Sequence, residues 1–191
     1  ATITASTTGA YITAEGADDL TATGASTGET HTLQTSGINV EAVDSGFSAV
    51  TTAGDSAGDD YGTFKVKVDI TAFEEDIFIS QTAALAFTSR FENSSNAAVI
   101  ATSSTADASS TTMSISTTAD TDNGQYRINE GDTESFTFTT TLDPGNAHQG
   151  KSIRMQLLNI NFGNDNVNVE ESIWTASPAA DYETDGTLIN N

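Results

Sequence analysis

The sequence contains no cysteine among its 191 residues, and this absence removes three kinds of chemistry. No disulfide can cross-link the fold, no thiolate can bind a metal, and no thiol can act as a nucleophile. The sequence also has no run of about eighteen consecutive apolar residues, so no segment is expected to insert in a membrane.

Basic residues are also scarce. Lys and Arg number six against 27 Asp and Glu, which gives a formal net charge of −21. Binding to a phosphate backbone needs clustered Lys and Arg, and an anionic membrane surface repels a chain of this charge. We therefore expect neither nucleic acid nor a membrane surface as a partner. The six basic residues are spread along the chain: Lys65, Lys67, Arg90, Arg127, Lys151 and Arg154.

The remaining composition bears on location. Thr, Ser, Asn, Asp and Gly are abundant while Lys is rare, as in secreted surface proteins, and a start at Ala1 without Met fits a chain trimmed after export. We expect an extracellular or cell-surface location. An acidic, Lys-poor surface also suits a cytoplasm of high salt, which stays the alternative.

Residues 1–36 have too few apolar side chains to build a core. Such a segment cannot offset the entropy of ordering by burial. Its first six residues, Ala1–Ser6, alternate apolar with hydroxyl side chains, which is the period of a strand. We predict an extended N-terminal arm whose strand pairs with a sheet edge, in its own chain or in a neighbour. Its assembly residues are expected to be Ile3, Ala5 and Ile12.

Residues 37–191 form a series of expected short strands separated by Gly, Asp and Asn turns. The clearest strand is Thr63–Ile70, where even-numbered side chains are apolar and odd-numbered ones are polar, as in a strand buried on one face. The pattern predicts about nine to eleven strands, and two packed antiparallel sheets would cover their apolar faces. We predict an all-β antiparallel sandwich, Ig-like or jelly-roll, with a closed barrel as the alternative.

Three further patterns make specific predictions. Ser152–Phe162 changes the parity of its apolar residues at Leu158, which indicates a β-bulge. Ala84–Phe91 is expected to form a strand, and Phe73 is expected to continue the core. The side chains expected to be buried are Phe64, Val66, Val68, Phe136, Phe138, Ile153 and Met155, and those expected to be exposed are Lys65 and Lys67.

Loops rich in Asp, Asn and Gly are candidate calcium sites, because carboxylate and amide oxygens on a tight loop are what a hard cation needs. The residues of the first candidate are Asp120, Asp122 and Asn123, and those of the second are Asp55, Asp59 and Asp60. Beside the first candidate, Gly124 permits a sharp turn as at the start of an EF-hand loop. A third such loop spans residues 164–170. Solvated turns of the same composition are the alternative.

The sequence offers no catalytic motif. Its two histidines, His31 and His148, lie in separate polar segments, and no serine lies in a nucleophile-elbow motif. A glycosidase would need two carboxylates about 5 to 10 Å apart across a cleft, which a sequence cannot show. We expect that the protein is not an enzyme. Trp174 and Tyr182 could form a sugar-stacking platform, although a lone Trp more often packs in a core or at a sheet edge.

The C-terminal part resembles a β domain found at the ends of secreted surface proteins of small-genome bacteria. The similar segments are YRINEGDTESFTFTTTLDP, SIRMQLLNINFGNDN and WTASPAADYETDGTLIN, together with the strand YGTFKVKVDITAFEEDIFIS. The resemblance covers about residues 36–191 and rests on strand and turn patterns. It implies a surface location and a sandwich, and it implies no activity or functional residues.

The layout of an arm and a sandwich is similar to that of donor-strand filament subunits. Calcium-dependent tubule proteins of hyperthermophilic archaea share the size and the lack of cysteine, but the Lys–Glu networks of hyperthermophile surfaces are missing here. This resemblance implies a subunit that assembles head to tail with itself by β-strand addition. The alternative is a calcium-dependent adhesion or carbohydrate-binding module, and a hydrolase comes third.

Overall fold

The chain divides into two compact units, Ala1–Thr35 and Ser36–Asn191. In the first unit, β1 (Thr2–Ile3) pairs antiparallel with β2 (His31–Thr32). The second unit is built almost entirely from strands. The structure, a computed structural model, describes residues 2–3, 31–32, 37–54, 60–95, 98–100, 108–144 and 150–189.

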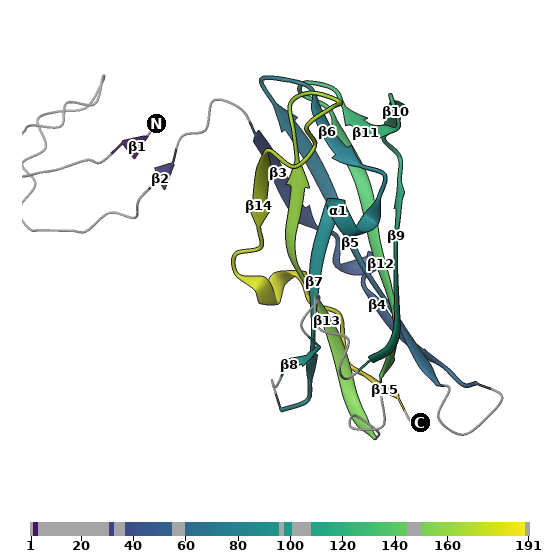
Figure 1. Cartoon of the computed structure of the whole chain (residues 1–191). Coiled ribbons are helices and arrows are strands. Elements are labelled where there is room, and N and C mark those ends of the chain that lie inside the picture. The colour runs from purple at the N-terminus through teal and green to yellow at the C-terminus, as the bar shows by residue number, and fades with distance from the viewer. Residues whose placement is uncertain are drawn as a thin grey trace, which may run out of the picture. The chain divides into compact units, whose positions relative to one another are not determined.

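The second unit is an all-β antiparallel sandwich, as predicted (Figure 1). In one five-stranded sheet, β3 and β4 pair with the two halves of β5, which is followed by β12 and β9. Over the described residues this sheet ends at β3 and β4 on one side and at β9 on the other, so it does not close into a barrel. The bounds are β3 (Gly37–Ala42), β4 (Ser48–Thr52), β5 (Tyr61–Phe73), β9 (Ala108–Thr117) and β12 (Thr133–Pro144).

The facing sheet also has five strands, and a three-stranded sheet lies beside them. In the facing sheet β14 and β15 pair with β13, which is followed by β7 and β8, and the small sheet has the order β10-β11-β6. Their bounds are β6 (Ile77–Ser80), β7 (Phe87–Asn93), β8 (Ala98–Ile100), β10 (Asp120–Asp122), β11 (Gln125–Ile128), β13 (Lys151–Phe162), β14 (Ser172–Thr175) and β15 (Thr187–Ile189). The short helices are η1 (Asp44–Gly46), α1 (Ala83–Ala86) and η3 (Ala179–Tyr182).

The core lies between the two large sheets. Ring contacts join them: the centroids of Phe64 and Phe91 are 5.2 Å apart, and those of Phe138 and Phe87 are 4.7 Å apart. On the other face of β5, Lys65 is exposed and Lys67 is half-buried. The alternation therefore placed the inner face and Lys65 correctly, whereas Lys67 is more covered than predicted because Gly46 of η1 packs against its side chain. The predicted core residues are all confirmed as fully buried: Phe64, Val66, Val68, Phe136, Phe138, Ile153 and Met155.

The predicted bulge in β13 is confirmed. The register with β7 shifts between Leu157 and Asn159, so Leu158 is the extra residue. Ile153, Met155 and Leu157 are buried before the bulge, and Ile160 is buried after it. The bulge thus lets one long strand keep apolar side chains against the core through a change of parity.

Two local predictions are wrong. Phe73 has 49% of its surface exposed rather than continuing the core. It ends β5 at an odd-numbered position, which shares the outer face with Lys65. The segment predicted as a strand from Ala84 to Phe91 begins with the helical turn α1, because alanine has the highest helix propensity and the run before Phe87 is Ala-Ala-Leu-Ala.

One lateral side of the sandwich is closed by hydrogen bonds between its two sheets. The Tyr182 hydroxyl donates to the Val40 carbonyl oxygen at 2.8 Å, which ties η3 to β3. The Thr51 hydroxyl donates to the Leu188 carbonyl oxygen at 2.7 Å, which ties β4 to β15. The edge formed by β3 and β4 is therefore held against the C-terminal segment.

Candidate functional site

The opposite edge of the first sheet is formed by β9. Over the described residues, β12 is the one strand that pairs with β9, and the helical turn α1 lies close to β9. The other edge of β9 therefore carries backbone groups that no described strand pairs with. Its sequence, Ala108–Thr117, contains no charged residue and no proline. Natural sheet edges are normally protected by charge, proline, bulges or shortness, because a long neutral edge is a template for another strand. This edge has ten residues without charge or proline, and its only irregularity in the ladder with β12 is a register shift at its first residues, between Ala108 and Ser110.

The side chains of β9 alternate as in a partly covered strand. Met113 and Ile115 are half-buried and pack against the core, while Ser114 and Ser116 are exposed. Thr140 lies opposite Met113 on β12 and is 1% exposed, and its hydroxyl has no hydrogen-bond partner. Because Met113 and Ile115 are half-buried whereas the inward side chains of β5 are fully buried, the core is less completely covered at this edge than at β5.

The arm residues predicted for assembly are described only in part. Ile3 lies in β1, where it pairs with His31 of the same chain. This pairing uses one edge of β1, and no other described strand pairs with β1. Ala5 and Ile12 lie outside the described residues. The prediction that the arm pairs with another copy stays a prediction.

The first calcium candidate is a β-hairpin in this structure. Asp120 and Asp122 belong to β10, and Asp122 pairs with Gln125 across a two-residue turn. Asn123 has φ 49° and Gly124 has φ 78°, as in the type I′ turn that Asn-Gly favours. The sharp turn predicted at Gly124 is present, and it serves to reverse a strand.

Three acidic segments approach one another beside this hairpin. Asn166 donates to Asp122 at 3.3 Å, and Asn164 donates to Glu75 at 3.3 Å. Asp165 accepts the backbone N–H groups of Asn168 and Val167, which lower the pKa of its carboxyl. These contacts fix the 163–170 loop against the hairpin and the turn after β5.

The second calcium candidate is described at one of its three residues. Asp60 accepts the backbone N–H of Gly54 at 3.0 Å, and Asp55 and Asp59 lie outside the described residues. Within the described ranges, no three acidic or histidine side chains are grouped closely enough to hold a metal ion. Calcium binding therefore remains a prediction.

If calcium stabilises the protein, its removal is expected to lower the midpoint of thermal unfolding, since a ligand that binds only the folded state adds stability. The measurement is a melting curve in excess chelator against one in calcium. Magnesium at the same concentration controls for screening of the −21 charge. Identical melting curves in chelator and in calcium would show that calcium does not stabilise the folded protein.

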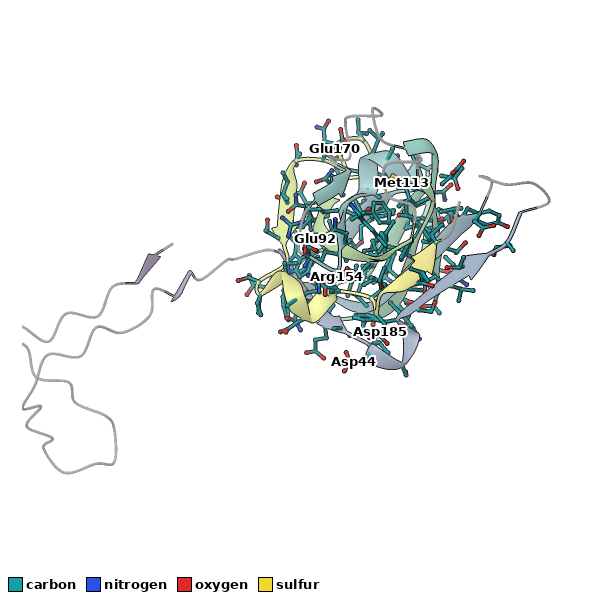
Figure 2. The ribbon with its side chains drawn as sticks, turned by 90° about the horizontal axis from the view of Figure 1, so that it is seen from below. Asp44, Glu92, Met113, Arg154, Glu170 and Asp185 are labelled. Carbon is teal, nitrogen blue, oxygen red and sulfur yellow. The ribbon has the colours of Figure 1, made fainter. Side chains whose placement is uncertain are left out.

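A network of ion pairs lies on the outer face of the second sheet. Glu92 is 2.6 Å from an Arg90 guanidinium nitrogen and 2.9 Å from one of Arg154. Arg154 also reaches Glu183 at 2.7 Å, and Gln156 donates to the same carboxylate. Figure 2 shows Glu92 and Arg154 side by side. The network holds the segment after η3 against β7 and β13.

Sequence reasoning did not identify this network. The signal that the sequence offers for this network is a pair of polar side chains at alternate positions of each strand: Arg90 and Glu92 on β7, and Arg154 and Gln156 on β13. The pairing register sets Arg154 opposite Glu92 and Gln156 opposite Arg90. Because that register depends on the bulge and on the sheet order, the sequence pattern alone could not give the partners.

Trp174 and Tyr182 pack against each other and do not form an exposed platform. Their ring centroids are 4.9 Å apart in an edge-to-face arrangement, and Tyr182 is 9% exposed. Burial raises the pKa of the Tyr182 hydroxyl, helped by the charges of Asp181 and Glu41. The hydroxyl therefore stays protonated and donates to Val40. The expected packing role for this pair is the one observed.

An acidic pocket of about 590 Å³ lies beside η3. Phe47 and the carboxyl-bearing residues Asp44 and Asp185 line it, and Figure 2 shows the two aspartates near each other, on the side of the sandwich away from Met113. Asp181 and Glu183 complete the acidic lining. The carboxylates give this side of the molecule a negative potential.

Acid is expected to weaken one ion pair. Asp76 accepts the Glu130 backbone N–H at 3.0 Å and an Arg127 N–H at 2.5 Å, and these bonds lower the pKa of Asp76 below 3.8. The contribution of Asp76 is complete above pH 3.8 and is lost as the pH falls through the lower folded-state pKa. The stability difference between wild type and Asp76→Asn, measured by urea unfolding, should shrink below that pH. A difference constant from pH 6 to about pH 2.5 would contradict this.

No family model, curated protein or solved structure matches this chain. No helix in the described part of the chain is long and apolar enough to cross a membrane.

Proposed function

We propose that the protein is a structural subunit of an extracellular or cell-surface assembly, in which the N-terminal arm of one copy adds as a strand to a sheet of the next. The observation that carries this proposal is the neutral edge of β9. A ten-residue strand without charge is unusual in a chain with a net charge of −21. Such an edge is a surface for strand addition.

The arm has a composition that suits this role. Ala1–Ala14 contains no charged side chain, so its approach to another copy brings no carboxylate against carboxylate. Its affinity would come largely from backbone hydrogen bonds, each worth about 0.5 to 1.5 kcal/mol net. Several such bonds, with Ile3 and Ile12 covering apolar surface, would form a stable joint.

The proposed joint would connect copies into a chain. The donor segment and the acceptor edge are different parts of the molecule, so each copy can donate to one neighbour and accept from another. A head-to-tail interface of this kind does not close on itself, and it propagates into a filament unless the rotation between copies happens to make a ring.

An adhesion or carbohydrate-binding module is the second candidate. The observation that favours it is the meeting of the 163–170 loop with the β10–β11 hairpin, through Asn166 and Asp122. Loops gathered at one end of a sandwich are a common place for binding sites. This candidate predicts a monomer of 19.8 kDa, whereas the assembly proposal predicts much larger species.

Deletion of Ala1–Thr13 tests the proposal. The full chain should sediment as large species and form filaments in electron microscopy, and the truncated chain should be a folded monomer. A chain in which these residues are replaced by an equally long Gly-Ser segment controls for length. If the truncated protein still forms filaments, the arm does not make the joint.

A further inference from the structure

We infer that the acceptor is the outer edge of β9 and that its occupant is the segment Ala1–Ser6 of a second copy. This inference rests on the proposed function, because it names the partner surfaces of the same joint. It follows from comparing β9 with every other edge in the described part of the sandwich, and from the charge and side-chain pattern of the two segments.

The opposite edge of the first sheet is unsuitable for a long added strand. It is divided between β3 and β4 by the helical turn η1. The Val40 carbonyl accepts the Tyr182 hydroxyl, and Thr51 bonds to the C-terminal segment. β3 also carries Glu41, which is exposed. An incoming strand would meet a break, a charge and a neighbouring segment.

The edges of the other sheets are short or charged. β14 and β15 have four and three residues and are separated by η3. β8 has three residues, and the part of β7 that β8 leaves free includes Arg90 of the ion network. β10 carries Asp120 and Asp122, and β6, at the other end of the small sheet, has four residues and is bridged at Phe78 to Gly163. None of these edges offers more than a few neutral residues in a row.

β9 and the arm match each other in charge. No charged residue lies from Ala108 to Ala119, and none lies from Ala1 to Ala14. In a chain where 27 carboxylates face six basic side chains, most contacts between copies would bring like charges together. A joint between these two neutral segments avoids that repulsion. At about 3.3 Å per residue, β9 is also long enough to accept all six residues of Ala1–Ser6.

The side chains fit the same arrangement. Ile3 and Ala5 lie on one face of an extended segment, with Thr4 on the other. Placed beside β9, the Ile3 face continues the half-buried row of Met113 and Ile115, and Thr4 joins the exposed row of Ser114. The added strand would thereby cover the apolar surface that β9 leaves partly exposed.

Cysteine cross-linking tests the inference directly, because the natural chain has no cysteine. Copies carrying Thr4→Cys are mixed with copies carrying Thr112→Cys, Ser114→Cys or Ser116→Cys and oxidised with diamide. We expect a covalent dimer of one donor and one acceptor copy with at least one of the three, since adjacent strands set same-face Cβ atoms about 4.5 to 5.5 Å apart. The same mixtures under reducing conditions give the background.

Two other edges serve as controls for specificity. Thr4→Cys copies are oxidised with Asn39→Cys copies, which report on β3, and with Thr175→Cys copies, which report on β14. Cross-linking at β3 or β14 in place of β9 overturns the inference while the proposed function stands. If no edge cross-links and the full chain is a monomer, the proposed function fails as well.

A matched pair of substitutions provides a second readout. Ser114→Asp places a charge on the neutral edge, and Ser114→Asn places a neutral side chain of the same size there. We expect the aspartate to raise the concentration needed for assembly by about threefold or more, since a carboxylate on a sheet edge disfavours strand addition and repels another copy of the acidic chain, and the asparagine to leave it nearly unchanged. Equal assembly of both variants at all concentrations would contradict a joint at β9.

Discussion

Replacing Phe138 with alanine is expected to lower the free energy of unfolding by about 3 to 5 kcal/mol. Phe138 is fully buried at the centre of the sandwich, and its ring lies 4.7 Å from that of Phe87 in the facing sheet and 6.1 Å from that of Phe136. Truncation would leave a cavity between two sheets whose backbone ladders resist collapse. The free energy of unfolding therefore falls for two reasons, because the substitution removes buried apolar surface and also leaves a cavity.

The measurement is urea unfolding followed by the fluorescence of Trp174, the one tryptophan of the chain. Phe73→Ala is the matched control, because Phe73 is 49% exposed at the end of β5. Its cost should be well under that of Phe138→Ala, about 0.5 kcal/mol or less for a surface substitution. Equal effects of the two substitutions would mean that the faces of these strands are assigned wrongly.

The second large effect is expected from Glu92→Gln. The Glu92 side chain is 9% exposed and bonds to two guanidinium groups. The amide would remove the negative charge between them, while Arg154 would keep its ion pair with Glu183 and Arg90 its hydrogen bond to Gln156. Breaking a buried ion pair costs about 3 to 5 kcal/mol. Because these arginine side chains are 41% and 29% exposed, solvent screening reduces that value, and we expect about 2 to 3 kcal/mol.

Arg127→Gln gives the comparison for an exposed pair. Arg127 bonds to Asp76, and their side chains are 38% and 34% exposed. An exposed pair contributes about 0 to 1 kcal/mol, so this variant should unfold at nearly the wild-type urea concentration. If Glu92→Gln is as mild as Arg127→Gln, the network does not hold the C-terminal segment against the sheet.

Much of the sandwich could be predicted from the sequence, because its central strands alternate clearly between buried and exposed faces. β5 and β12 follow the period of two without interruption, and the change of parity at Leu158 gave the bulge in β13. The exposure of Phe73 could have been predicted from its odd-numbered position, which places it on the face of Lys65 once the strand continues past Ile70. The helical turn α1 could not be predicted, because the Ala-rich run before Phe87 is compatible with helix or strand until tertiary packing decides.

The candidate site was less accessible to sequence reasoning. Asn123-Gly124 could have been identified as a type I′ hairpin turn from the dipeptide alone. The position of β9 at the edge of its sheet could not be predicted from the sequence, because it depends on which strands are neighbours. The contact between Asn166 and Asp122 likewise joins segments that are 44 residues apart, and only the fold brings them together.

The most direct test of the central claim is whether a free peptide with the sequence of residues 1–13 binds the chain from which those residues are deleted. Fluorescence anisotropy of the labelled peptide should show saturable binding of one peptide per chain, and the bound peptide should block assembly of the full chain. A peptide in which Thr4 and Ala5 are both replaced by proline lacks two backbone N–H donors, one on each side of the strand, and should bind far more weakly. If the two peptides bind equally, or if neither binds while the full chain still assembles, strand addition by the arm is not what joins the subunits.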